Sequence, residues 1–516
     1  MNGKKILVTV AIVLALLAAA AGGMLIFLNQ HVVIDFRFYS KNAQQLDLRE
    51  KEVSVTHYQQ LQEALPQCRI LWNVPFQGNL VSSDVKELTV TSLSHEDVEA
   101  IVYFTDLQTL KARDCKNYDH LLTLRNAYPQ LQMEYLLPIN GEVYDQDTTE
   151  MKITAITGQE LALLPCLTKL ETVTVSGGEN LENIAQLQSY CQEKGLEFQV
   201  ALGDQVLNAT MDSVRAEAIT EGELQLLQFM PQLKSLHLVS PEASAESVFA
   251  LRSGRPDLNM TWEYIIWGVP VTMEDKEVDL SEGQVTTLED VEKGLAYFPE
   301  VTNVFLGEPG FDNEEIAAYR ERRRADYKVV WVVDLSGKMK VRTDIDNFMP
   351  SRDGWGYVRD HEIDNIRYCE DIICMDIGHM GVKDVSFLET LVNLEYLILA
   401  HTEVQYVDPI VNCKKLKFLE LDWSCIRDVS PLVELTALED LNLGMVWPDL
   451  TPIYEMKWLK NLYLINGNTK GNWPELLPNT RVVTRGTATV ASGWRNLPNY
   501  YKMRDILGMY YMSAGY

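Results

Sequence analysis

The fold of this 516-residue chain is decided by four short segments near its C-terminus: LEYLIL (Leu394–Leu399), LKFLEL (Leu416–Leu421), LEDLNL (Leu438–Leu443) and LKNLYL (Leu459–Leu464). Their first leucines are 22, 22 and 21 residues apart, and each segment has leucine at its first, fourth and sixth positions. Self-similarity at a fixed period of this length is typical of a solenoid, in which each repeat packs only on its neighbours. We therefore predict a coil of stacked strands over residues 351–480.

The sequence around these segments extends the repeat. Each strand is followed by a turn, an apolar residue (Val382, Val404 or Ile426) and a convex element such as DVSPL (Asp428–Leu432). Over residues 365–470 this pattern resembles the 22-residue, internalin-like leucine-rich repeat of bacterial surface proteins. One position departs from the family, because its usual asparagine is replaced by Met380, Thr402, Ser424 and Val446. The resemblance implies the same fold with less regular turns, in which the usual amide ladder is missing or replaced by hydroxyls.

Upstream the period is longer. Strand patterns with alternating apolar residues begin at Cys68, Leu131, Leu196, Leu258 and Tyr327, and the starts of four of them are followed ten residues later by glycine: Gly78, Gly141, Gly268 and Gly337. Between them lies a second strand series, LQTLKA, LETVTV, LKSLHL and VTNVFL, and a helical pattern precedes each member. A turn residue at a fixed offset after a period-two strand indicates a repeated supersecondary unit. The alternative is a string of separate small α/β domains.

These long units resemble the divergent leucine-rich-repeat units of membrane-anchored surface proteins of Gram-positive, Firmicutes-like bacteria. The resemblance lies in ALPQCRILWNVPFQG and in VKELTVTSLSHEDVEAIVYFTDLQTL. It implies an α/β leucine-rich-repeat solenoid with long divergent strand–helix units.

The N-terminal stretch from Ile6 to Leu28 contains no charged residue. As a helix rising about 1.5 Å per residue it is about 35 Å long, which suffices to cross roughly 30 Å of hydrocarbon. It predicts a transmembrane signal-anchor helix, and Lys4 and Lys5 place residues 1–5 in the cytoplasm and residues 30–516 outside the cell. The alternative is a cleaved signal peptide, for which Ala18–Ala21 would supply the small-residue cleavage site.

The predicted organisation therefore has five parts: a cytoplasmic stub (1–5), an anchor helix (6–28), long-period repeats (29–350), 22-residue repeats (351–480) and a C-terminal cap (481–516). The stretch PSRDGWGYVRDHE from Pro350 marks the change of repeat length and is a candidate joint. Residues 492–512 are rich in aromatics without repeat spacing. A cap over the open core of the last repeat is the first interpretation, and a partner-docking patch is the alternative.

The net charge of −28 argues against nucleic-acid binding, because a phosphate backbone is bound by concentrated lysine and arginine. The one dense basic run comprises Arg320, Arg322, Arg323 and Arg324. We expect it on the solvated face of a helix, with a polyanion or lipid-headgroup contact as the alternative.

No catalytic or cofactor-binding motif is present, so we expect a protein that is not an enzyme and has no cofactor and no metal site. The chain has eight cysteines, and no two of them form a CxxC motif. We expect Cys68, Cys166, Cys191 and Cys413 to be buried free thiols. Disulfides between Cys369 and Cys374, or between Cys413 and Cys425, are the alternative.

The concave face is the candidate binding site. Strand leucines point into the core, so the residues between and after them should point toward a partner. The predicted partner-binding residues are Asp376, Tyr396, Ile398, His401, Phe418, Glu420, Asp422, Trp423, Asp440, Asn442 and Tyr463, with His401 and Trp423 at the rim. The sequence thus predicts a membrane-anchored extracellular scaffold that binds a protein or glycan without catalysis. The alternative is a structural, self-associating spacer of the cell envelope, which would form homo-oligomers.

Overall fold

The computed structural model describes residues 3–487 and 491–509. It divides into two compact units, Met1–Met260 (the N-terminal unit) and Thr261–Tyr516 (the C-terminal unit). The division falls inside the predicted long-repeat region.

The N-terminal unit begins with helix α1 (Gly3–Gln30), which covers the whole predicted anchor segment. Its described apolar side chains face outward; Leu16 and Leu25, for example, are 64% and 69% exposed. In the part of the chain whose side chains are described, no helix has the length and apolar character needed to cross a membrane.

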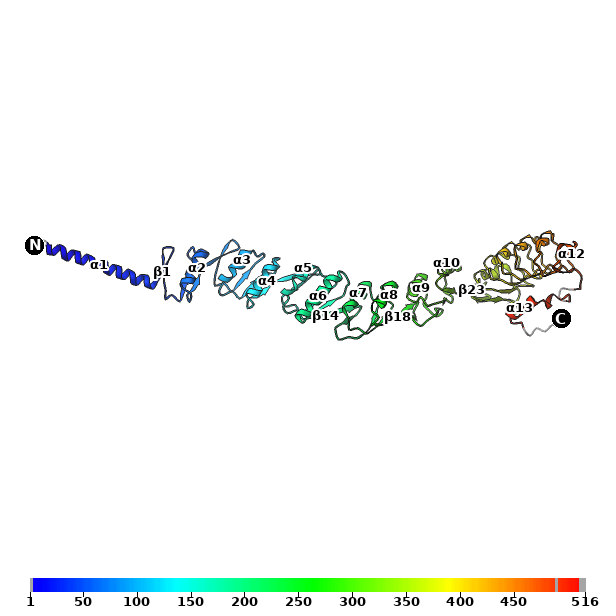
Figure 1. The fold of residues 1–516 in the computed structure, drawn as a ribbon, viewed down its shortest axis with the longest axis horizontal. Helices are drawn as coiled ribbons and strands as arrows, with labels where there is room; N and C mark the ends of the chain where they lie inside the picture. The colour runs from blue at the N-terminus through cyan, green and yellow to red at the C-terminus, as the bar shows by residue number, and fades with distance from the viewer. Residues whose placement is uncertain (1–2, 488–490, 510–516) are drawn as a thin grey trace. The chain divides into compact units, whose positions relative to one another are not determined.

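After α1 the N-terminal unit repeats one arrangement (Figure 1). Short parallel strands alternate with helices, and the last strand of each repeat runs into or is followed by an antiparallel hairpin. The helices are α2 (Val55–Ala64), α3 (His95–Ala100), α4 (Tyr118–Ala127), α5 (Gly158–Leu161), α6 (Leu181–Lys194), α7 (Glu221–Leu226) and α8 (Ala245–Gly254). The parallel strands are β3 (Gln45–Asp47) with β4 (Arg69–Leu71); β7 (Glu87–Thr89), β8 (Thr109–Lys111) and β9 (Gln132–Glu134); β12 (Glu150–Ile153), β13 (Thr172–Val175) and β14 (Glu197–Leu202); and β16 (Ser213–Glu217) with β17 (Ser235–Val239).

The hairpins explain the regularly placed glycines. In the N-terminal unit they pair β1 (His31–Ile34) with β2 (Arg37–Ser40), β5 (Asn73–Phe76) with β6 (Asn79–Ser82), β10 (Leu136–Ile139) with β11 (Glu142–Asp145), and β14 with β15 (Gln205–Leu207). The predicted glycine Gly78 has φ +73° and follows Gln77 at φ +51°, and Gly141 follows Asn140 in the same way. Two consecutive residues with positive φ form the turn that matches the twist of a two-residue hairpin, and glycine adopts this conformation without steric strain.

The C-terminal unit continues the same pattern before the repeat shortens. Hairpins pair β18 (Asn259–Ile266) with β19 (Val269–Thr272) and β23 (Val332–Leu335) with β24 (Met339–Arg342), and their turns contain the predicted Gly268 and Gly337. A parallel sheet contains β20 (Glu277–Asp279), β21 (Asn303–Phe305) and β22 (Lys328–Val330), accompanied by helices α9 (Leu288–Leu295) and α10 (Asn313–Arg323).

The 22-residue repeats then form one parallel seven-stranded sheet, as their leucines predicted. Its strands are β25 (Asn347–Phe348), β26 (Cys374–Asp376), β27 (Tyr396–Ile398), β28 (Phe418–Glu420), β29 (Asp440–Asn442), β30 (Asn461–Tyr463) and β31 (Arg481–Val483). The convex side consists of short helices: α11 (Asp360–Ile363), 3-10 turns at Asp364–Tyr368, Ser386–Glu389, Asp408–Asn412, Ser430–Glu434 and Thr451–Glu455, and α12 (Trp473–Leu476). The chain ends in a 3-10 turn (Trp494–Asn496) and helix α13 (Pro498–Ile506).

Leucines from consecutive strands fill the core of this coil. Leu397, Leu419, Leu441 and Leu462 are in register with one another and fully buried. At the position where the family has asparagine, the hydroxyls of Thr402 and Ser424 each donate to the carbonyl three residues earlier, at 2.7 Å. The hydroxyls therefore satisfy turn carbonyls, as the sequence predicted.

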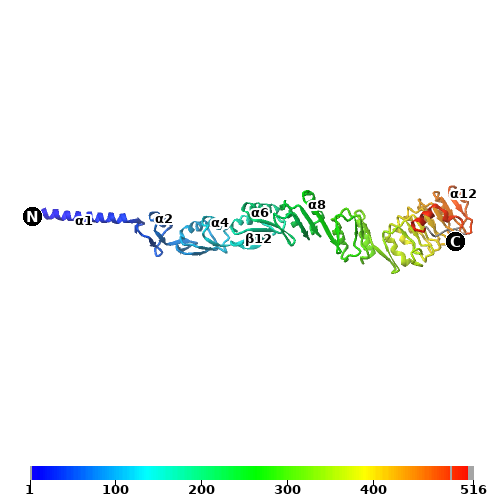
Figure 2. The ribbon, with the colours of Figure 1, turned by 90° about the horizontal axis from the view of Figure 1, so that it is seen from below.

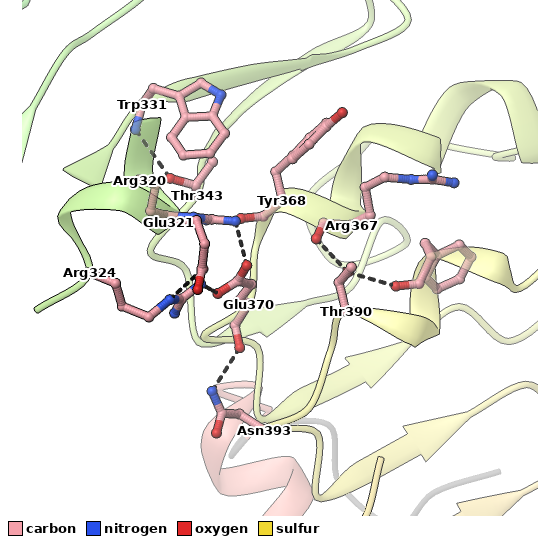
Figure 3. Close-up of polar contacts among 11 residues, drawn as sticks. Arg320, Glu321, Arg324, Trp331, Thr343, Arg367, Tyr368, Glu370, Thr390 and Asn393 are labelled. Carbon is pink, nitrogen blue, oxygen red and sulfur yellow. Dashed lines mark hydrogen bonds and ion pairs between the residues drawn. The ribbon is translucent and has the colours of Figure 1, made fainter. Parts of the chain in front are cut away.

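The arginine run lies in and just after the last turn of α10, and the expectation of a solvated helix face is wrong for Arg320 (Figure 3). The Arg320 side chain is only 12% exposed; it pairs with Glu370 at 2.5 Å and donates to the Tyr368 carbonyl at 2.8 Å. Arg324 reaches the other Glu370 oxygen at 2.8 Å. Because Glu370 belongs to the first short repeat, these ion pairs join the long units to the short ones, although the Arg324 side chain remains 52% exposed, as predicted. Arg322 is exposed, as predicted.

All eight cysteines are free thiols, and all except the exposed Cys425 are buried. The expectation for Cys68, Cys166, Cys191 and Cys413 is confirmed, and neither alternative disulfide forms.

Candidate functional site

Strand register places the predicted concave residues in two rows. Tyr396, Phe418 and Asp440 lie directly beside one another on β27, β28 and β29. The second row lies two residues further along and extends over β26 to β30. It consists of Asp376, Ile398, Glu420, Asn442 and Tyr463. The sequence thus identified the side chains of this face correctly.

The expectation that these side chains are exposed is wrong. Tyr396, Ile398, Phe418, Asp422, Asp440, Asn442 and Tyr463 are all buried, and Asp376 and Glu420 are partly so. Tyr396, Ile398, Phe418 and Tyr463 lie in one buried cluster with the chain's own C-terminal segment (residues 491–509), whose helix α13 lies beside the strands in both views of the fold (Figures 1 and 2). The segment that was predicted to cap the open core of the last repeat therefore lies over the concave face instead.

Aromatic packing holds the C-terminal segment in place. Trp494 is fully buried. Its ring centroid lies 4.6 Å from that of Phe418 and 5.0 Å from that of Tyr463. Further along the segment, four apolar residues join the same cluster: Leu497, Tyr500, Met503 and Leu507. A patch that would otherwise expose large rings to water is closed by this contact.

Specific hydrogen bonds fix the position of the segment. The Trp494 indole Nε1 donates to Glu420 Oε2 at 2.8 Å. The amide of the buried Asn499 donates to Asp440 Oδ2 and Glu439 Oε2, each at 3.0 Å. At the far end Arg352 Nη1 donates to the Leu507 carbonyl at 2.7 Å. The contact is therefore both apolar and directional.

The carboxyl groups under the C-terminal segment have raised pKa values. Burial raises the pKa of Glu420 to about 7, opposed by the Trp494 hydrogen bond and supported by the nearby Asp422 and Asp376. Burial also raises the pKa of Asp376 and that of Asp440. Covering this face therefore favours the neutral form of its acids.

The rim of the sheet is the exposed part of the predicted site. The residue seven positions after the first apolar residue of each repeat has positive φ: His379 (+62°), His401 (+55°), Trp423 (+53°), Met445 (+52°) and Asn466 (+55°). The amides of the first four of these residues donate to carbonyls of the next repeat; the His401 amide, for example, donates to the Asp422 carbonyl at 2.8 Å. The side chains are therefore stacked in one direction along the coil.

We call four exposed and partly exposed side chains the aromatic rim: His379, His401 and Trp423, which stack on one another, and Trp447, which lies two residues after the turn residue Met445. The imidazoles of His379 and His401 stack with their ring centroids 4.2 Å apart, and the centroid of the Trp423 ring lies 4.6 Å from that of His401. Trp423 is 58% and Trp447 is 70% exposed. Burial, together with the neighbouring His379, lowers the pKa of His401, so this imidazole is neutral at pH 7.

The sequence identified His401 and Trp423 at the rim but missed His379 and Trp447. His379 was detectable, because it stands at the same offset from Ile372 as His401 does from Leu394. Trp447 stands nine positions after Leu438, the first leucine of its repeat, where the preceding repeats have Glu403 and Cys425, so the repeat pattern does not predict it.

Within residues 3–487 and 491–509, no group of three or more histidine, cysteine or acidic side chains is arranged to hold a metal ion. The histidine–aspartate contact at His57 and Asp35, 2.5 Å, lies in the first repeat of the N-terminal unit.

Comparisons with known proteins give structural neighbours only. No protein-family model and no curated protein matches the chain. Internalin C2 of Listeria monocytogenes is 22% identical over 26% of this chain and 71% of its own, with a TM-score of 0.22. A second Listeria monocytogenes internalin, inlF, is 14% identical over 83% and 88%, with a TM-score of 0.21. A leucine-rich-repeat protein of Leptospira interrogans is 13% identical over 86% and 90%, with a TM-score of 0.22.

Proposed function

We propose that this protein is a non-catalytic, membrane-anchored scaffold on the outer surface of a Gram-positive bacterium, where it binds a protein or glycan partner. Helix α1 would be the anchor, since Ile6–Leu28 is uncharged and follows two lysines. The observation that carries the binding role is the aromatic rim, with two tryptophans more than half exposed on a stacked turn ladder.

We assign the partner contact to the rim because the concave face is already occupied. Tryptophan dominates binding energy at interfaces, since its ring supplies a large contact area with little conformational freedom to lose. The stack of His379, His401 and Trp423 restricts these rings before any partner arrives, which lowers the entropy lost on binding.

The test compares two double variants of the full chain in nanodiscs, by quantitative binding to cell envelopes of the source bacterium. Trp423→Ala with Trp447→Ala removes the exposed rings of the rim. Val392→Ala with Tyr406→Ala is the matched control, because these side chains are 47% and 55% exposed in the two preceding repeats but lie outside the rim. We expect the rim variant to weaken binding by at least about 30-fold, the effect of losing about 2 kcal/mol.

The control should bind like the wild type, and all three proteins should melt at the same temperature. Equal binding by the rim variant would refute the assignment. Homo-oligomers that resist salt and persist in the rim variant would instead support the alternative, a self-associating spacer of the cell envelope.

A further inference from the structure

The turn of the first hairpin differs from that of four of the five other hairpins. In four hairpins the second turn residue is a glycine with positive φ: Gly78, Gly141, Gly268 and Gly337. In the hairpin β1–β2 the same position is Phe36, at φ +60°, after Asp35 at φ +49°. A bulky residue is disfavoured in this conformation, because its Cβ crowds the backbone.

Phe36 gains no packing that would offset this strain. Its side chain is 100% exposed, so within the described chain it buries no apolar surface. The turn itself is fixed without the ring, because Asp35 Oδ2 lies 2.5 Å from His57 Nδ1 and the other nitrogen of His57 lies 3.0 Å from the Tyr39 hydroxyl. An exposed aromatic residue in a strained position is a candidate for contact with something outside the chain.

The two faces of this hairpin have opposite character. Ile34 and Tyr39 are buried on the side of α2. Val33 and Phe38 lie directly opposite each other on the other face, where they are 45% and 51% exposed. Together with Phe36 they form an apolar surface that the rest of the described chain leaves uncovered.

That surface adjoins the end of α1. The hairpin starts at the residue after the helix ends, and the Lys41 amide donates to the Gln30 carbonyl at 2.8 Å (Figure 1). The Phe38 ring lies edge-on to Phe27 of the last helical turns, with centroids 5.2 Å apart. The exposed face of the hairpin is therefore continuous with the apolar surface of α1.

We propose that the hairpin β1–β2 is a lipid-contacting element, in which Val33, Phe36 and Phe38 lie in the headgroup–acyl boundary of the outer leaflet. The proposal rests on the membrane anchor proposed above. Phe36 is within about 7 Å of Phe38 along the strand, and the interfacial layer is about 5–8 Å deep on each side of the hydrocarbon. Apolar aromatic side chains beside exposed cations favour this layer, and the neighbouring Arg37 and Lys41 are both exposed.

The experiment places the photocrosslinking residue p-benzoylphenylalanine at single positions of the purified full chain in nanodiscs of phosphatidylcholine and phosphatidylglycerol. Positions 36 and 38 probe the hairpin. Position 80 is the control, because Leu80 is 67% exposed on β6, the corresponding strand of the next hairpin. We expect lipid adducts, detected by mass spectrometry, at positions 36 and 38 and at least tenfold fewer at position 80.

Incorporation of the chain into nanodiscs without lipid adducts at 36 and 38 would overturn the proposal while leaving the anchor intact. A chain that does not incorporate at all would refute the anchor. Crosslinks between two copies of the chain at these positions would overturn the lipid assignment in favour of self-association.

A second variant, Phe36→Gly, separates contact from folding. It gives the turn the residue found in four of the five other hairpins, so we expect an unchanged or higher melting temperature in detergent. A lower melting temperature would show that Phe36 stabilises the fold, and would overturn its role as a residue kept for lipid contact.

Discussion

The concave face and the aromatic rim are formed by the same repeats, but the concave face is buried and the rim is exposed to solvent. On the concave face Phe418 is fully buried under the C-terminal segment, whereas on the rim Trp423, five residues later, is 58% exposed. Both positions carry aromatic side chains, and both were candidates for partner binding. The difference teaches that repeat register decides which way a side chain points, but only the non-repeated ends decide whether that surface is available.

Breaking the closed state of the concave face should have the largest effect. Trp494→Ala removes a fully buried ring and the donor to Glu420, so we expect the docked C-terminal segment to lose about 3–5 kcal/mol. Amide hydrogen exchange of α13 would measure this as faster opening. Tyr501→Ala is the control, because that side chain is 50% exposed on the same helix. Equal exchange in both variants would mean that Trp494 does not hold the segment.

Raising the pH is a second way to open the concave face. The pKa of Glu420 is raised from 4.5, the value of a solvated glutamate, to about 7. Between these two pH values the docked carboxyl keeps its proton, whereas a solvated carboxyl loses it. Docking is therefore fully favoured below pH 4.5 and weakens as the pH rises to 7, by on the order of 3 kcal/mol. Asp376 and Asp440 act in the same direction, because burial raises their pKa values too.

The measurement is the exchange of α13 as a function of pH, corrected for the intrinsic pH dependence of exchange. Glu420→Gln keeps an acceptor for Trp494 but cannot ionise, so its profile should be flatter than that of the wild type. A wild-type profile that is already flat would refute the linkage.

A substitution in the aromatic rim should have a smaller effect on stability, and it should leave the docking of α13 unchanged. His401→Ala removes the middle ring of the stack with His379 and Trp423, which we expect to destabilise the local turns by about 0.5–1.5 kcal/mol. Faster exchange of residues 400–424, with unchanged exchange of α13, would show that the two surfaces are separate. Equal acceleration of α13 would show that they are coupled, and the contrast between them would fail.

Periodic features of the fold were predictable because each follows from local spacing. The leucines from Leu394 to Leu464 fixed the parallel sheet and its register, and glycines such as Gly78 located hairpin turns. The concave rows were assigned to the correct face for the same reason. Their burial was not predictable, because Trp494 and α13 lie outside the repeats and no spacing relates them to β28.

Non-periodic charge contacts were missed for a related reason. Arg320 lies on a helix whose sequence alone suggests solvent exposure, but Glu370, fifty residues later, approaches it when the first short repeat stacks on β22–β24. The first hairpin was also missed, because Phe36 replaces the glycine that identified the others.

The docking of the C-terminal segment also sets an order of events during synthesis. Trp494 lies 31 residues after Tyr463, the last residue of the rows that it covers. At about 5–20 residues per second, the ribosome needs about 2–6 s to make that interval. Throughout it, the nascent chain presents the rings of Tyr396 and Phe418 without their cover. The aromatic sheet thus stays open to the solvent and to chaperones after its own strands have been made.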